Sequence, residues 1–270
     1  MISRNTSGLI IRGKIMRFFN PKKIEYLFKK LPFFTESFLL KRRAERYLKK
    51  QTEPEILILE DLVSQGQASI DIGVYRGMYS YHLLKYSEFV YAFEANSLLI
   101  DKIKKSFKNN NNIKIENLAI SSSSGTTKLK IPIRDENVEH DHEQKYQLGI
   151  ASIHAGNDLD NLNYHSIDVK KITLDQYHFQ HKIGFIKIDV EGHELDIIRG
   201  GKNLLERDKP NLLVEIEERH TGLAPQLVIR EIKNLGYQCY ILNREFELEV
   251  INEKEDFNFN NNNFIFKPNK

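Results

Sequence analysis

Three acidic residues, Asp71, Glu94 and Asp189, each close an apolar run that is typical of a buried β-strand. A buried carboxylate without a partner is costly, so such residues usually meet a ligand or a hydrogen-bond donor. Glu94 follows Asp71 by 23 residues, a spacing at which nucleotide-binding units bring an acid to a ribose. There it would accept hydrogen bonds from two vicinal hydroxyls and repel a 2′-phosphate. The alternative is that Glu94 only caps the helix that follows.

Two glycines, Gly73 and Gly77, follow Asp71 in a turn that leads into a helical pattern. Such a turn lets the backbone approach a ligand closely, and the helix N-terminus carries partial positive charge. The dinucleotide-binding pattern G-x-G-x-x-G has a third glycine, which this turn lacks. The acid beside the turn also suits a cationic ligand better than a pyrophosphate. S-Adenosylmethionine fits both conditions, with Asp71 near its ammonium group and Glu94 at its ribose.

The segment after Asp189 adds groups that suit proton transfer. Moving a methyl group from a sulfonium to a hydroxyl requires an aligned acceptor and the removal of its proton. The unperturbed pKa of His193 suits a base, and Asp189 would be the base itself or would orient it. Glu191 is a third catalytic candidate, although it would equally cap the next helix. Glu215 and His220 are further candidates at the mouth of the site. A divalent metal at these carboxylates is an alternative, but no metal site is predicted.

Five segments, taken in order, resemble the FkbM family of S-adenosylmethionine-dependent methyltransferases. They are Asp71–Ser80, Tyr91–Asn96, Asn117–Ser121, Ile186–Glu194 and Leu212–Glu217. The resemblance spans about residues 66–220 and implies a class I methyltransferase fold, in which a seven-stranded sheet has an antiparallel edge. It also implies O-methylation of a sugar or secondary-metabolite hydroxyl. Two positions beside the cofactor depart from the family: Tyr75 stands where Asn is common, and Ala95 where Pro is common.

Motifs and resemblance together predict two sets of site residues. The predicted cofactor-binding residues are Asp71, Gly73, Tyr75, Gly77, Glu94, Ala95, Ala119 and Asp189. The predicted catalytic residues are Asp189, Glu191 and His193.

Apolar runs that alternate with helical patterns must position these residues. The runs predict strands at 67–72, 89–93, 113–119, 127–133, 183–189, 211–217, 237–242 and 263–267. Helices are expected at 54–64, 77–86, 97–108, 191–201 and 224–235. The alternation indicates an α/β fold with a doubly wound, Rossmann-like, mostly parallel sheet, whose last two strands form an antiparallel pair at the C-terminal edge. Ligands bind such sheets beyond the carboxyl ends of the strands.

Two parts of the chain differ from this pattern. Residues 134–170 are polar and rich in His, Asp and Asn, without clear periodicity, and we expect an irregular insert that helps to bind the acceptor. Its histidines match no metal-binding spacing. Residues 1–50 read as helical and hold 14 basic and 3 acidic residues. The chain is therefore divided into a basic helical N-terminal extension, 1–50, and a methyltransferase domain, 51–270, that carries the insert.

Charge and composition restrict the partners and the compartment. The net charge of +3 combines the basic extension with an acidic remainder of 26 basic and 34 acidic residues. A basic amphipathic segment either packs on the main domain or contacts an anionic membrane surface, whereas no nucleic-acid-binding motif accompanies it. The chain has no apolar stretch long enough to span a membrane and no secretory leader, and its single cysteine forms no internal disulfide. A cytoplasmic protein is expected.

The leading interpretation is a methyltransferase that uses S-adenosylmethionine. Its acceptor would be a hydroxyl of a saccharide, glycolipid or secondary metabolite, as in polysaccharide biosynthesis. Two alternatives share the architecture. One is an NAD-dependent Rossmann enzyme, against which the missing glycine counts. The other is a non-catalytic cofactor-binding module of a glycan-assembly complex.

Overall fold

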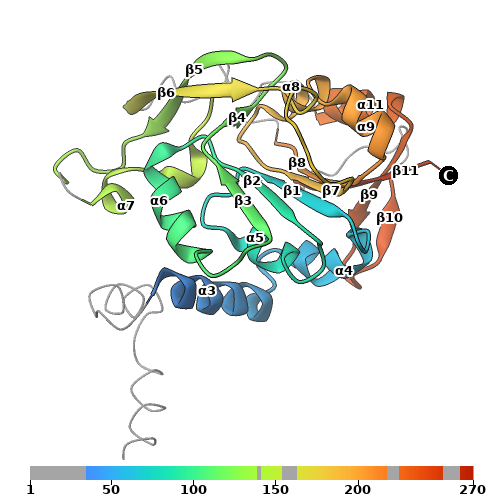
Figure 1. Cartoon of the computed structure of the whole chain (residues 1–270), viewed down its shortest axis with the longest axis horizontal. Helices are drawn as coiled ribbons and strands as arrows, with labels where there is room; N and C mark the ends of the chain where they lie inside the picture. The colour runs from blue at the N-terminus through green and yellow to red at the C-terminus, as the bar shows by residue number, and fades with distance from the viewer. Residues whose placement is uncertain (1–34, 139–140, 154–162, 218–224, 252–261, 270) are drawn as a thin grey trace, which may run out of the picture.

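In the computed structural model, which describes residues 35–138, 141–153, 163–217, 225–251 and 262–269, eight strands form one central sheet (Figure 1). The strand order is β10-β9-β11-β8-β7-β1-β2-β3. The parallel strands are β1 Ala68–Ile72, β2 Val90–Phe93, β3 Ile113–Glu116, β7 Ile183–Ile188 and β8 Asn211–Glu215. The remaining strands are β9 Tyr237–Leu242, β10 Leu248–Val250 and β11 Asn263–Pro268. This arrangement confirms the predicted doubly wound, mostly parallel α/β fold.

The antiparallel pair at the C-terminal edge is also confirmed, with one addition. Strand β11 inserts between β8 and β9 and runs antiparallel to both. The sheet has eight strands rather than the expected seven because β10 pairs with β9 outside this pair. The extra strand is only three residues long and partly exposed, so it leaves no apolar run in the sequence.

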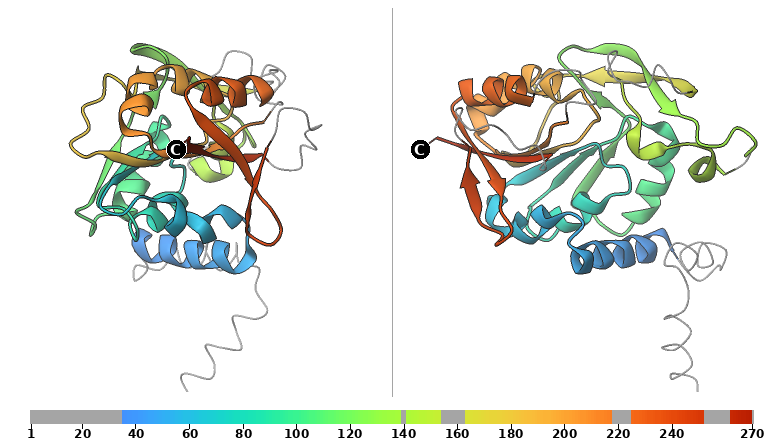
Figure 2. Two further views of the ribbon diagram at one scale, coloured as in Figure 1. Left: turned by 90° about the vertical axis from the view of Figure 1, so that its right-hand side faces the viewer. Right: turned by 180° about the vertical axis from the view of Figure 1, so that it is seen from behind.

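Continuous apolar runs form the central strands because helices cover both faces of the sheet. Every residue of β7 is buried. One face packs against α8 Glu194–Arg199, α9 Lys202–Asp208 and α11 Pro225–Asn234. The opposite face packs against η1 Pro54–Ile58, α4 Leu59–Leu62 and α5 Met78–Leu83. Figure 2 shows these two layers on either side of the sheet.

Helix α3, Glu36–Lys50, represents the N-terminal extension in the described part of the chain. Thr35 caps it by accepting a hydrogen bond from the backbone N–H of Phe38. Leu40 and Ala44 bury one side of α3 in a cluster shared with α5 and with α6, Ser97–Ser106. The helix therefore lies under the main domain (Figure 1). The rest of the predicted extension, 1–34, falls outside the described residues.

A second, three-stranded sheet has the order β4-β6-β5. Its strands are β4 Ala119–Ile120, β5 Gly125–Pro132 and β6 Tyr164–Ile172. It corrects two expectations. The predicted strand 113–119 ends at Glu116, and Ala119 joins the small sheet instead. The predicted insert 134–170 is not irregular to its end, because β6 pairs with β5 from Tyr164 to Lys171. Most of β6 is exposed, so polar residues hide its alternation.

The insert also contains two short helical segments. They are α7 His142–Lys145 and η2 Leu148–Ile150. The small sheet lies on the same side of the central sheet as α8 and away from α3 (Figures 1 and 2).

Helix α9 was not predicted, because the pattern at 191–201 was expected to end at its glycines. Asp175 caps α9 from a distant loop, accepting hydrogen bonds from the backbone N–H groups of Asn203 and Leu204 at 3.2 and 2.9 Å. A cap that comes from elsewhere in the chain leaves no local signal. Among the described helices, none is both long and apolar enough to cross a membrane.

Candidate active site

Four adjacent strands end in a row of side chains at the carboxyl edge of the central sheet. The last paired row is Phe93, Ile72, Ile188 and Val214. The residues one step further along β2, β1, β7 and β8 are Glu94, Gly73, Asp189 and Glu215. Backbone hydrogen bonds continue into this second row, from Gly73 N to Phe93 O at 3.0 Å and from Asp189 N to Ile72 O at 3.1 Å. Three carboxyl groups and one glycine therefore meet at this edge.

Gly73 gives this row its open centre. It has φ +82°, and a Cβ placed on it would lie 1.8 Å from the carbonyl oxygen of Asp189. Any side chain there would force β1 and β7 apart at their ends. The glycine thus lets the two strands stay paired up to the site.

Glu94 is buried, with only 8% of its surface exposed. Its Oε2 accepts a hydrogen bond from Tyr75 N and its Oε1 accepts one from Asn96 N, both at 2.8 Å. Burial raises the pKa of Glu94 to about 7, although these two N–H groups oppose the rise. The N-cap of α6 is Asn96, whose Oδ1 accepts from Leu98 N. Capping of that helix therefore does not require Glu94, and its carboxylate keeps lone pairs for a ligand.

Tyr75 connects the turn to the insert. Its φ of 49° is unusual for a residue with a side chain. Its backbone N–H donates the hydrogen bond to Glu94 Oε2. The aromatic ring packs against Gly149, where a Cβ would lie 3.2 Å from the ring. The guanidinium of Arg76 lies 5.3 Å from the centroid of the same ring.

Lys187 lies beneath Asp189, and its side chain is only 6% exposed. Its Nζ donates to Asp189 Oδ2 at 2.7 Å and to the carbonyl oxygen of Gly73 at 3.4 Å. Burial lowers the pKa of Lys187, but the carboxylates of Asp189 and Asp71 outweigh burial and hold it above its usual value. A charged ammonium group is therefore held inside the domain at the floor of the site.

Glu215 stands beside Asp189 and hydrogen bonds with it. Burial, followed by the charge of Asp189, raises the pKa of Glu215 well above its usual range. Two neighbouring carboxyl groups of this kind resist being ionised at the same time.

The loop after Asp189 brings two more predicted residues to the site. Glu194, and not Glu191, closes this loop: its Oε1 accepts from Gly192 N at 3.1 Å and from Val190 N at 3.3 Å. His193 contacts Ser121 Oγ through Nε2 at 2.9 Å and lies 3.5 Å from Asp196 through Nδ1. The imidazole is thus held between the small sheet and α8.

One pocket collects most of these residues. The open space between its walls, including solvent at the mouth, is about 750 Å³. Among the predicted residues, those that line it are Gly73, Tyr75, Glu94, Ala95, Ala119, Asp189, Glu191 and His193. Glu215, the further candidate, also lines it.

Two predicted cofactor residues, Asp71 and Gly77, do not line this pocket. Asp71 lies inside β1, 1% exposed, and accepts a hydrogen bond from Ser80 Oγ at 2.5 Å. Its register partner on β7 is Lys187. Gly77, with φ +78°, begins α5 and faces Phe107, whose ring would lie 2.7 Å from an added Cβ. In this structure the two residues support the turn from below.

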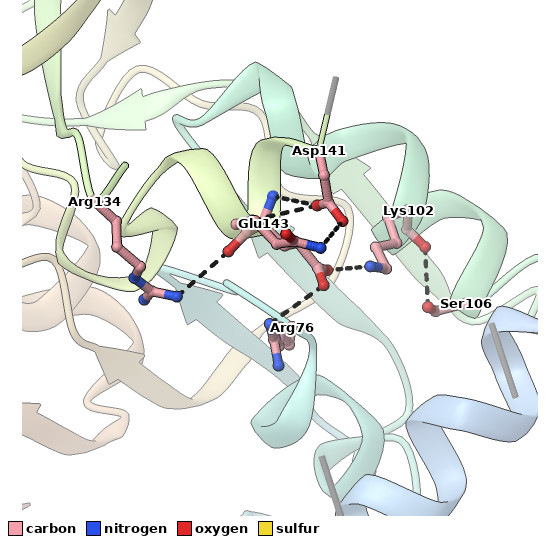
Figure 3. A network of polar contacts seen from close by, with 7 residues as sticks. Arg76, Lys102, Ser106, Arg134, Asp141 and Glu143 are labelled. Atoms are coloured by element: carbon pink, nitrogen blue, oxygen red, sulfur yellow. Dashed lines mark hydrogen bonds and ion pairs between the residues drawn. The ribbon is translucent and has the colours of Figure 1, made fainter. Parts of the chain in front are cut away.

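The insert supplies a wall that the sequence did not indicate. Leu148, Gly149, Ala151 and Ile153 line the pocket opposite the strand ends. Short helix α7 fastens this wall to the main domain (Figure 3). Asp141 caps α7, and the Glu143 carboxylate pairs with Arg76 at 3.6 Å and with Lys102 of α6. The turn and the wall are therefore joined by ionic contacts on one side and by Tyr75 on the other.

Sequence reasoning missed Lys187 as well as this wall. Its signal was available: a lysine flanked by Ile186 and Ile188 inside a fully apolar strand must find anionic partners. The wall gave only a weak signal, six mostly small or apolar residues inside a polar stretch.

No group of three or more metal-ligating side chains occurs among the described residues. Two histidines of the insert, His140 and His154, and the further candidate His220 lie outside the described ranges.

Comparison with known families identifies one match. The model of the methyltransferase FkbM domain matches residues 71–239, more than half of the chain. Comparison with curated proteins gave no match.

Several solved structures have a similar arrangement but low sequence identity to this chain. An FkbM methyltransferase from Methylobacillus flagellatus is 13% identical, with a TM-score of 0.45; the match covers 94% of this chain and 60% of that one. A TehB-like SAM-dependent methyltransferase from Corynebacterium glutamicum is 10% identical, with a TM-score of 0.41, over 85% of this chain and 100% of that one. Magnesium protoporphyrin IX methyltransferase from Synechocystis, solved with bound SAM, is 10% identical, with a TM-score of 0.41, over 98% and 100%. These scores are too low to support an assignment by themselves.

Proposed function

The chain belongs to the FkbM family of methyltransferases, and from that premise we propose that it transfers a methyl group from S-adenosylmethionine to a hydroxyl group. The acceptor class that we propose is a saccharide, glycolipid or secondary metabolite. The observation that carries the proposal is the row of residues at the strand ends, Glu94, Gly73, Asp189 and Glu215. In this row Glu94, the acid expected to bind a ribose, and the carboxylate of Asp189 lie on either side of a glycine.

The residues that line the pocket fit the cofactor. Glu94 offers a fixed carboxylate with free lone pairs for the ribose hydroxyls. Phe93, Leu118 and Ile120 add apolar surface of the kind that an adenine ring needs. Carboxylates of Asp189 and Glu191 on the same wall favour a cationic ligand.

Asp189 is the group that we assign as base. The cofactor supplies an electrophilic methyl group on sulfur, which is already a good leaving group. Asp189 follows the carboxyl end of β7 and lines the pocket, and it accepts a hydrogen bond from Lys187. His193 lines the same pocket but holds Ser121, so we assign it to acceptor binding. Glu191 remains a candidate for the same contact.

The acceptor would enter beside the insert wall. Leu148, Ala151 and Ile153 present an apolar surface, and the polar side chains of Glu191 and His193 line the same pocket. Such a mixed surface suits a sugar ring, which has apolar faces and polar edges.

We further propose that the basic extension keeps the enzyme at the cytoplasmic face of an anionic membrane. Residues 1–50 hold 14 basic residues, and Lys41, Lys49 and Lys50 of α3 are exposed. A positively charged segment gains roughly 1 kcal/mol per basic residue near such a surface. A glycolipid precursor would be encountered there.

Calorimetric titration with S-adenosylmethionine, S-adenosylhomocysteine and NADH tests the cofactor assignment. The first two should bind and NADH should not; binding of NADH alone would favour a dehydrogenase. Transfer of tritium from methyl-labelled cofactor to a panel of mono- and oligosaccharides then tests the acceptor class. If the protein binds the cofactor but labels neither the panel nor any component of cell extracts, it would instead be a binding module.

A further inference from the structure

We propose that Glu215 and Lys187 are positioning residues. Each donates a hydrogen bond to Asp189, and together they keep its carboxylate ionised and oriented toward the pocket. This inference rests on the proposed function, because Asp189 is assigned there as the base. The inference adds two features to that assignment. Glu215 keeps a proton, and the buried Lys187 ammonium group contacts Asp189.

The strand register brings the three residues together. Lys187 and Leu213 are register partners on β7 and β8, so Asp189 and Glu215, two residues later on each strand, are also neighbours. Side chains two residues apart point to the same face of a sheet. Lys187, Asp189 and Glu215 therefore share one face, and the last two line the pocket.

Lys187 is fixed in its place from several directions. Its Nζ donates to Asp189 and to the carbonyl of Gly73, and it lies 5.0 Å from the centroid of the Tyr79 ring. The Tyr79 hydroxyl in turn contacts Glu53 at 3.4 Å. An ammonium group enclosed in this way has few other positions available, so it holds Asp189 Oδ2 in one direction.

One cation faces more carboxyl groups than it can neutralise. The Asp71 side chain is its register neighbour, and Glu53, Asp189 and Glu215 also interact with it electrostatically. Asp71 is fully buried, and Glu53, Asp189 and Glu215 are each only partly exposed. Four such carboxylates beside a single ammonium group would leave uncompensated charge, so not all of them are ionised together.

Glu215 is the group best placed to keep its proton. Burial raises its pKa most, and the neighbouring charges of Asp189 and Glu191 add to this rise, while Lys187 opposes it. A protonated Glu215 donates a hydrogen bond to Asp189. Asp189 then receives two donors, Lys187 and Glu215, at a position that lines the pocket.

In the proposed methyl transfer, Asp189 is the group that takes the proton of the acceptor. The acceptor O–H bond breaks, its proton passes to Asp189, and the acceptor oxygen forms the new bond to the methyl carbon. The sulfur–methyl bond breaks and its electron pair stays on sulfur. Glu215 and Lys187 keep their own protons throughout, so they fix the direction of Asp189 and do not exchange with the acceptor.

Carbon-13 NMR of the protein labelled at the Asp and Glu carboxyl carbons tests the pair without acceptor or cofactor. One Glu signal should stay in its protonated form between about pH 5 and pH 9 and disappear in Glu215→Gln. The Asp189 signal, identified by its loss in Asp189→Asn, should stay ionised over that range. In Glu94→Gln, the matched control, the protonated signal should persist. A Glu215 signal that titrates near its ordinary value overturns the proposal.

Lys187→Met tests the contact between the Lys187 ammonium group and Asp189. The Asp189 pKa should rise by at least about one unit, because the cation that stabilises its charge is gone. If this variant does not fold, the Glu215→Gln titration still decides the part of the proposal that concerns Glu215. An unchanged Asp189 pKa in folded Lys187→Met overturns the role of the lysine.

Turnover separates positioning from mere packing. With an acceptor from the screen above, Glu215→Ala should lower kcat about 10- to 100-fold, whereas Glu215→Gln, whose amide still donates to Asp189, should recover most of it. Equal losses in the two variants overturn the donor role. Cofactor that fails to bind while Glu215 keeps its proton overturns the proposed function instead, so the two failures are distinguishable.

Discussion

At the scale of single residues, the site depends on carboxylates whose donors are backbone N–H groups. Glu94 and Glu194 each accept two such bonds, one beside the turn and the other in the loop after Asp189. Burial raises the pKa of both to about 7. Yet only Glu94 lines the pocket, so only it is available to a ligand.

Replacing Glu94 with Gln should weaken S-adenosylmethionine binding about 10- to 100-fold. The amide loses the charge that strengthens hydrogen bonds to ribose, and its NH₂ group opposes one of the two backbone donors. Calorimetry measures the change. The matched control is Glu116→Gln, a strand-end glutamate on the adjacent β3 that does not line the pocket. Equal affinities for Glu94→Gln and wild type would remove Glu94 from the cofactor site.

The same residue predicts a pH dependence. Because the ionised form accepts the ribose hydroxyls and the pKa of Glu94 is about 7, cofactor affinity should fall as pH drops below 7. The fall should approach tenfold per pH unit and should be absent in Glu94→Gln. Calorimetric titrations at a series of pH values measure it, and a flat profile for the wild type would contradict the role of the carboxylate.

Gly73 should tolerate no side chain. Gly73→Ala combines a positive φ with a Cβ 1.8 Å from the Asp189 carbonyl, so we expect a loss of at least about 3 kcal/mol in unfolding free energy and no cofactor binding. Gly236→Ala is the control, since Gly236 also has a positive φ but nothing within 4 Å of its Cβ. It should lose only about 1 kcal/mol. Urea unfolding compares them, and similar losses would mean that the close approach does not matter.

At the scale of elements, regular apolar runs made the central strands predictable, while the features that complete the site were not. Strand β6 is mostly exposed, so its alternation was hidden among polar residues. Helix α9 takes its cap from Asp175, which lies far from it in sequence. The neighbouring positions of Asp71 on β1 and Lys187 on β7 follow from a strand register that no local pattern shows. Strand ends and their acids were predicted because burial and alternation act locally; the contacts between distant segments were not.

The insert wall should depend on its ionic fastening to α6. Glu143→Ala removes the carboxylate that meets Arg76 and Lys102, so the segment around α7 and η2 should open more often. Hydrogen–deuterium exchange of residues 141–150 should speed up and cofactor affinity should fall a few-fold. Each of these partly exposed surface pairs contributes only about 1 kcal/mol, so the overall fold should persist. Asp168→Asn, which breaks an exposed pair with Lys128 on the small sheet, is the control and should leave both measurements unchanged. Unaltered exchange in Glu143→Ala would mean that Tyr75 and Gly149 hold the wall alone.

At the scale of the whole molecule, charge is divided along the chain. The first 50 residues carry 14 of the 40 basic residues and only 3 of the 37 acidic ones. Helix α3 lies on the face of the domain opposite the small sheet (Figures 1 and 2). If α3 faced an anionic membrane, the small sheet and the insert would therefore face away from it.

Co-sedimentation of the full chain with vesicles tests this arrangement. Binding to vesicles that contain phosphatidylglycerol should exceed binding to phosphatidylcholine vesicles at least about tenfold, and it should weaken steeply as salt rises from low to physiological ionic strength. Replacing Lys41, Lys49 and Lys50 by Gln removes three exposed charges of α3, and the preference should fall because each contributes separately to the attraction. Lys128→Gln, on the small sheet, is the matched control and should have no effect, since that sheet lies away from α3. Equal binding to both vesicle types would contradict attraction by the basic extension. Binding that survives high salt would instead indicate that apolar residues insert into the bilayer.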